Sequence, residues 1–129
     1  MKKKKLTGKG EYIYDYKHDT LTFKMKDRDY KRSIELQNFV IDIDFSNAIT
    51  GIRVFDASKV FGVNKYLLKN IVHGEFKADV EKNMVTITLK FVGMQRNKLM
   101  PLLSQKHNFA HQITAPIKNV ADSTVECAV

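Results

Sequence analysis

The residues best suited to chemistry are three aspartates in the stretch VIDIDFSNAITGIRVFDASKVFG, residues 40–62. Asp42 and Asp44 stand one residue apart on an apolar segment, and Asp56 follows the next apolar segment. Carboxylates bind a hard cation or act as an acid and base pair when their oxygens converge beside a substrate cleft. A hydrolase that uses these three aspartates with a divalent ion is therefore one hypothesis.

Each aspartate also has a structural role that needs no substrate. Asp44 stands at the entry to a turn, and Asp42 lies diagonal to Arg53 across a predicted pair of strands. Asp56 precedes a predicted helix, whose first backbone N–H groups attract an anion. We favour these structural roles, so we assign no catalytic residue and no metal ligand.

Two histidines, His107 and His111, have the four-residue spacing that directs two ligands to one metal on a helix. The segment HNFAH lacks the glutamate of the zinc-protease motif, and alternating apolar residues up to Pro116 indicate a strand. On a strand the two side chains lie about 13 Å apart, too far for one ion. We expect solvent-facing or partly buried histidines.

Other segments give no stronger sign of a catalytic or cofactor site. GKG at residues 8–10 lacks the later glycine and the strand–helix setting of a phosphate-binding loop, so we interpret it as a flexible entry to the first strand. Ser104 and Ser123 have no local partner that would activate a nucleophile. The single cysteine, Cys127, permits no intramolecular disulfide and fits a reducing cytoplasm. The sequence predicts no cofactor and leans away from an enzyme.

The chain is basic, with 22 Lys and Arg residues against 14 Asp and Glu residues and a net charge of +8. Half of this excess comes from four consecutive lysines in residues 1–10, which we interpret as a basic flexible tail. Basic and acidic residues then alternate in KMKDRDYKR, residues 24–32, as on a solvated surface. The alternative is a nucleic-acid contact made by Lys2, Lys3, Lys4, Lys5, Lys24, Lys26, Arg28, Lys31 and Arg32.

Three hairpins would position these residues, and each is recognised by a turn that pairs apolar with apolar side chains. This test is strict because a one-residue slip turns every side chain to the other face of the sheet. The first hairpin turns at His18 and Asp19, and its pairs are Tyr16 with Leu21, Tyr14 with Phe23 and Tyr12 with Met25.

The second and third hairpins follow the same logic. The second turns at Ser46 and Asn47 and pairs Ile43 with Thr50, Ile41 with Ile52, Phe39 with Val54 and, on the other face, Asp42 with Gly51. The third turns at Lys82 and Asn83 and pairs Val80 with Val85, Ala78 with Ile87 and Phe76 with Leu89. A protein of three such hairpins is strongly antiparallel.

Two short helices are predicted between the second and third hairpins. Asp56 and Asn64 suit helix N-caps, and Gly62 and Gly74 suit helix stops. We therefore predict an α+β fold, an antiparallel sheet built from hairpins with a short helical layer crossing it after the fourth strand.

The rest of the chain gives weaker signals. Pro101 prevents a helix from running through residues 94–107, alternation from Phe109 to Pro116 indicates a strand, and residues 124–129 suit a last strand. With 43% hydrophobic residues we expect residues 11–129 to fold as one domain. We find neither a signal peptide nor a membrane span, which predicts a cytoplasmic protein that does not bind a membrane.

The segments YDYKHDTLTFKM and VIDIDFSNAITGIRVFDASKVFG resemble a small family of uncharacterised prokaryotic domains over residues 12–62. The shared pattern falls on Tyr14, Asp15, Asp19, Leu21, Asp42, Asp44, Gly51, Ile52, Asp56, Ala57 and Ser58. This chain departs from it with Asn-Ala in the second turn, where the family has an acidic residue and glycine, and with a long additional C-terminal half. The resemblance implies the fold of this segment and no established activity.

These observations predict a non-enzymatic protein that acts through protein contacts and self-associates as a homodimer. This prediction has two reasons. The sequence shows no set of catalytic residues that would meet at one place, and one short helical layer cannot cover the whole predicted sheet, so that apolar sheet surface is left for an interface. The alternative is a nucleic-acid-binding module that uses the basic tail and the 24–32 loop.

Overall fold

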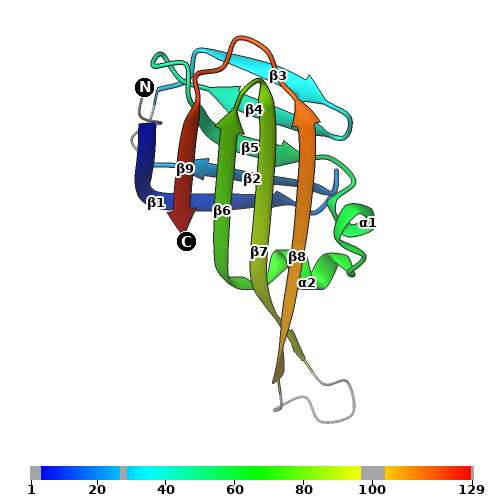
Figure 1. Cartoon of the computed structure of the whole chain (residues 1–129). Helices are drawn as coiled ribbons and strands as arrows, with labels where there is room; N and C mark the ends of the chain where they lie inside the picture. The colour runs from blue at the N-terminus through cyan, green and yellow to red at the C-terminus, as the bar shows by residue number, and fades with distance from the viewer. Residues whose placement is uncertain (1–3, 27–28, 97–103, 129) are drawn as a thin grey trace.

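The computed structural model of the chain describes residues 4–26, 29–96 and 104–128 (Figure 1). In these residues one sheet of nine strands is accompanied by two short helices. The elements in chain order are β1 (Lys4–Asp15), β2 (Thr20–Met25), β3 (Arg32–Leu36), β4 (Phe39–Ile43), β5 (Ile49–Val54), α1 (Ala57–Phe61), α2 (Lys65–Lys69), β6 (Ile71–Glu81), β7 (Met84–Arg96), β8 (Ser104–Pro116) and β9 (Ser123–Ala128). The strand order across the sheet is β3-β4-β5-β2-β1-β9-β6-β7-β8, and β1 with β9 is the parallel pair.

Strand β1 joins two halves of the sheet whose strands run in crossing directions (Figure 1). Its first part, residues 4–9, pairs with β9, and its second part, residues 10–15, pairs with β2. The expectation of a flexible tail over residues 1–10 was therefore wrong from Lys4 onward. A strand needs an apolar residue only at alternate positions, and Leu6 packs against the core while its neighbours Lys5 and Thr7 are exposed.

The core lies between the inner faces of the two halves. Phe23 of β2 stacks on Phe76 of β6 at 5.7 Å between ring centroids and meets Phe91 of β7 edge-on at 5.9 Å. All three rings are at most 2% exposed. These aromatic contacts bind the N-terminal hairpins to the C-terminal half of the sheet.

The predicted registers are confirmed for the third hairpin and for most of the second. Pairs such as Val80 with Val85 and Ile41 with Ile52 are as predicted, whereas Ile43 faces Ile49 because the register shifts at a bulge after Asp42. The first hairpin is offset by two residues from the prediction, and its pairs are Tyr14 with Leu21, Tyr12 with Phe23 and Gly10 with Met25.

The helices occupy the predicted residues but follow the fifth strand, because β3 was not predicted. The Asn64 side chain caps α2 by accepting the Leu67 N–H, and Gly62 ends α1 with φ +67°, as predicted. Gly74 does not end a helix, since α2 stops at Lys69 and Gly74 lies within β6. The main contacts of α1 and α2 are with β8 and β7 respectively.

The two predicted C-terminal strands are present as β8 and β9. Pro101 lies outside the described residues. No helix in the described part of the chain is long and apolar enough to span a membrane.

Candidate functional site

The turn between β1 and β2 meets the start of α1 at a buried carboxylate, Asp19. Its oxygens accept hydrogen bonds from the Tyr14 hydroxyl at 2.6 Å, the Ser58 N–H at 3.0 Å and the Ser58 hydroxyl at 2.6 Å. The backbone carbonyl of Asp19 accepts the Ala57 N–H at 2.9 Å. Asp19 therefore caps the first turn of α1 from a distant point in the sequence. We call Tyr14, Asp19 and Ser58 the Asp19 tie.

The surroundings of Asp19 favour a carboxylate that stays ionised over one that takes up and releases a proton. Burial raises the pKa of Asp19, but hydrogen bonds from Ser58 and Tyr14 outweigh it and hold the pKa below its usual value. Burial and the hydrogen bond to Asp19 raise the pKa of the Tyr14 phenol. Tyr14 thus stays a neutral donor to an ionised carboxylate whose two oxygens are both engaged.

Asp56 was predicted to cap α1, and this prediction was wrong. Its backbone is left-handed, with φ 51° and ψ 44°, and its side chain makes no capping hydrogen bond. The reason is that Asp19 already takes the N–H groups of Ala57 and Ser58. Among the described residues, the exposed Asp56 carboxylate has no hydrogen-bond or ion-pair partner.

On the outer face of the same corner lies an open hollow of about 590 Å³, which we call the β1–β2 groove. Its lining includes Ile13, Asp15, His18, Thr20, Phe55 and Asp56. Ile13 is 55% exposed and Phe55 is 40% exposed, although both side chains are large and apolar. Asp15 binds the His18 ring at 2.8 Å, and the hydrogen bond from His18 lowers the pKa of the Asp15 carboxyl.

A second surface at this corner combines aromatic rings with lysines. The rings of Tyr16 and Tyr66 are 6.0 Å apart and tilted by 53°. The ammonium groups of Lys65 and Lys69 lie 5.2 Å and 5.4 Å from the centre of the Tyr16 ring. We call these four residues the Tyr16 patch. Sequence reasoning missed it because Tyr16 lies in the β1–β2 turn and Tyr66 on α2, and only the fold brings the two together.

The other predicted acidic residues have the structural roles assigned to them. Asp42 forms the predicted ion pair with Arg53, at 3.1 Å, and also accepts the Ser33 hydroxyl. Asp44 is 2% exposed, and Oδ1 of its carboxylate accepts the N–H groups of Ser46 and Ala48 at the turn entry. Within the described residues, no group of three His, Cys, Asp or Glu side chains is placed to hold a metal ion.

The histidines were predicted to be solvent-facing or partly buried, and His111 is confirmed as partly buried. Its ring stacks on Phe39 at 5.9 Å and meets Phe61 edge-on at 5.8 Å. His107 belongs to β8, but its side chain lies outside the described part of the structure.

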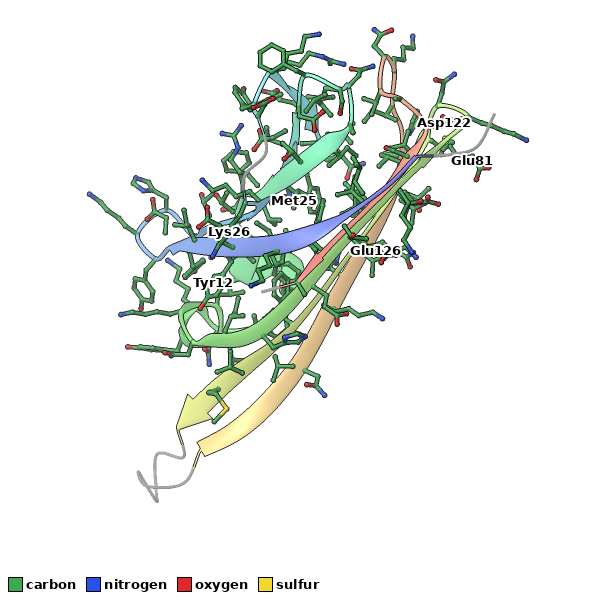
Figure 2. The ribbon with its side chains drawn as sticks, turned by 90° about the vertical axis from the view of Figure 1, so that its left-hand side faces the viewer. Tyr12, Met25, Lys26, Glu81, Asp122 and Glu126 are labelled. Atoms are coloured by element: carbon green, nitrogen blue, oxygen red, sulfur yellow. The ribbon has the colours of Figure 1, made fainter. Side chains whose placement is uncertain are left out.

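The residues of the predicted nucleic-acid contact do not share one environment. Lys24 pairs with Glu11 at 3.4 Å, and Arg32 donates to the Asn47 side chain at 3.0 Å. The others with described side chains are exposed: Lys5, Lys26 and Lys31. Figure 2 shows Lys26 on the side of Tyr12, well away from Glu81 and Asp122. The side chain of Lys4 and the residues Lys2, Lys3 and Arg28 lie outside the described part.

Proteins of a known family are similar to this chain in the segment that contains the Asp19 tie. A model of the family described as "Protein of unknown function (DUF2283)" matches residues 11–58, the span that contains the whole Asp19 tie. An uncharacterised protein of Methanocaldococcus jannaschii, MJ0789, is 34% identical over 66% of this chain and 74% of its own length. A Methanosarcina mazei protein named "Putative hypoxanthine phosphoribosyltransferase" is 32% identical over 70% of this chain and 73% of its own length. No solved structure matches the chain.

Proposed function

Since the chain belongs to the DUF2283 family, whose description assigns no activity, we propose a function from the chain's own geometry: a non-enzymatic domain that acts through protein contacts and self-associates as a homodimer. The observation that carries this proposal is the exposure of Ile13 and Phe55, two large apolar side chains that line the same open hollow, the β1–β2 groove. Large apolar side chains gathered in an open hollow are typical of an interaction site.

The polar residues of the β1–β2 groove favour a second copy of this chain as the partner. The same surface carries the Asp56 carboxylate, which has no partner among the described residues, and His18, whose Nδ1 is bound to Asp15 and whose Nε2 is a second hydrogen-bonding atom. A two-fold axis brings a patch against its own copy, so each patch must offer both members of every pair. His18 of one protomer and Asp56 of the other meet this condition.

The acidic residues support a non-enzymatic role. Both oxygens of Asp19 are engaged by Tyr14 and Ser58, and Asp42 is paired with Arg53. The activity in the name of the M. mazei relative belongs to that protein, and we do not extend it to this chain.

Sedimentation velocity at about 100 µM protein tests self-association, since contacts of micromolar affinity are saturated there. We expect a dimer for the parent and a monomer for Ile13→Ser and Phe55→Ser. The matched controls are Val72→Ser and Phe45→Ser, which remove side chains that are 56% and 68% exposed outside the groove. The controls should remain dimeric.

Two results would overturn this proposal in different ways. A strictly monomeric parent at this concentration ends the claim of self-association. A dimer that both groove variants retain keeps self-association but removes the β1–β2 groove as its interface.

The alternative, a nucleic-acid contact through the N-terminal lysines and the 24–32 loop, loses support at two of its residues. Lys24 and Arg32 are bound to Glu11 and Asn47, which compete with phosphate groups for them. Nucleic-acid binding has better support at another surface of this protein, the Tyr16 patch.

A further inference from the structure

The Tyr16 patch holds two positive charges at one place. Lys65 and Lys69 are four residues apart on α2, so their side chains leave the helix on the same side. Both ammonium groups lie over the Tyr16 ring, whose π-electrons attract cations. Lys65 is fixed further by a hydrogen bond of 3.3 Å to the Tyr16 carbonyl.

These two charges are available to an external anion. Among the described residues, no salt bridge includes Lys65 or Lys69. Asp15 and Asp19, the acids of the adjacent turn, are already hydrogen-bonded to His18 and to the other members of the Asp19 tie. The charge of Lys65 helps to lower the pKa of Asp19, but Lys65 is not hydrogen-bonded to this carboxylate. Two neighbouring ammonium groups repel each other, and a bound anion would relieve that repulsion.

The aromatic part of the Tyr16 patch is exposed to solvent. Tyr66 is 61% exposed and Tyr16 is 42% exposed, so these rings do not serve as core residues. Tyr66 stands on α2 beside the two lysines, and the lysines lie over Tyr16. The Tyr66 ring is therefore open to a flat ligand next to two fixed positive charges.

We propose that the Tyr16 patch binds single-stranded nucleic acid, with a base stacked on Tyr66 and the adjoining phosphates on Lys65 and Lys69. A phosphate alone would satisfy the lysines, and an acidic peptide offers no flat ring for Tyr66. An unpaired nucleotide offers both groups at the spacing of one residue of its backbone. The net charge of +8 attracts such a polyanion at long range.

This inference does not rest on the proposed self-association, because the Tyr16 patch shares no residue with the β1–β2 groove.

Fluorescence anisotropy with labelled oligo-U and oligo-dT of about 12 nucleotides, and with a duplex of that length, tests the proposal. At about 50 mM salt we expect the single strands to bind more tightly than the duplex. Tyr66→Ala should weaken single-strand binding about 5- to 100-fold, the loss of one stacked base, whereas Tyr66→Phe should bind like the parent. Replacing both lysines with glutamine should lower the slope of log affinity against log salt by about 1.4, for two phosphate contacts.

Two matched controls separate the Tyr16 patch from general surface effects. Tyr30→Ala removes a tyrosine that is 59% exposed elsewhere, and Lys118→Gln removes an exposed lysine of the segment between β8 and β9. Neither change should weaken binding by more than about twofold. Circular dichroism checks that each variant keeps the parent fold, which the exposure of Tyr66 leads us to expect.

Four results would overturn the proposal. They are no binding of oligo-U or oligo-dT at low salt, equal or tighter binding of the duplex, unchanged affinity in Tyr66→Ala, and equal competition by polyglutamate. The last result would mean that the lysines attract any polyanion.

Discussion

Ser58 donates both its backbone N–H and its hydroxyl to the carboxylate of Asp19, a residue 39 positions earlier in the chain. These bonds fasten the β1–β2 turn to the start of α1, and Tyr14 adds a third donor from within β1. Three separate parts of the family's segment thus meet at one buried charge. The Asp19 tie therefore gives a structural reason why Tyr14, Asp19 and Ser58 lie within one family segment.

Removing the Asp19 carboxylate should destabilise the protein, whereas removing that of Asp56 should not. Asp19→Ala leaves the Ser58 and Tyr14 donors without their acceptor, and we expect a loss of about 2–4 kcal/mol. Asp56→Gly removes an unbonded side chain from a residue with φ 51°, so we expect a change between zero and a gain of about 1 kcal/mol. Urea unfolding curves measure both, and equal midpoints for Asp19→Ala and the parent would contradict the capping role of Asp19.

The contribution of Asp19 should depend on pH. Its pKa lies below the ordinary value of 3.8, since the hydrogen bonds from Ser58 and Tyr14 outweigh the effect of burial. A carboxylate with a lowered pKa contributes stability that is complete above the unfolded pKa and is lost as pH falls through the folded pKa. The difference in unfolding free energy between the parent and Asp19→Asn should therefore be constant at neutral pH and shrink as pH falls through 3.8 and below. Asp15 is present in both proteins, so its own titration cancels, and a difference that does not shrink in acid would argue against this account.

The third hairpin could be predicted from the sequence because its two strands alternate strictly and its turn residues tolerate a left-handed backbone. Lys82 and Asn83 have φ values of +50° and +63°, as a tight hairpin turn requires. The first hairpin was harder, since a shift of two residues leaves every side chain on the same face. In the observed register the turn is longer, and the Asp15 side chain accepts the His18 N–H within it.

The Asp19 tie and β3 could not be predicted from local patterns. A rule about neighbouring residues assigns the cap of α1 to Asp56, and only the fold shows that Asp19, from the turn of the first hairpin, replaces it. In β3, Ile34 and Leu36 are only partly buried and follow a stretch of mixed charge that resembled a loop. Residues at the rim of a sheet bury little apolar surface, so their periodicity is weak.

Cys127 should resist alkylation in the folded protein. It is 5% exposed, and burial raises the pKa of its thiol to about 12, so the reactive thiolate is scarce at neutral pH. We expect iodoacetamide to label Cys127 at least about 100-fold more slowly in buffer than in denaturing urea, since labelling requires opening of β9. Mass spectrometry follows the reaction, and equal rates in the two solutions would show that β9 does not pack as described.

Alanine substitutions should distinguish glycines that the sheet requires from one that it tolerates. A Cβ at Gly51 would lie 2.9 Å from the backbone carbonyl oxygen of Phe23, and one at Gly10 would lie 3.0 Å from the Cys127 sulfur and 3.3 Å from the Lys24 carbonyl. Backbone atoms cannot move aside without breaking strand pairs, so we expect Gly51→Ala and Gly10→Ala each to cost about 1–3 kcal/mol.

Gly8 provides the matched control, because its added Cβ would meet only the terminal methyl group of Met25, at 2.9 Å. That methyl group ends a flexible side chain and can rotate away. Alanine also loses less backbone freedom on folding than glycine does, by about 0.5–1 kcal/mol. Gly8→Ala should therefore be neutral or slightly stabilising in urea unfolding. If Gly8→Ala destabilises the protein as much as Gly10→Ala, steric contact does not explain the loss. The loss would then mean that β1 needs both glycines for the backbone conformation of its bend, where its pairing passes from β9 to β2.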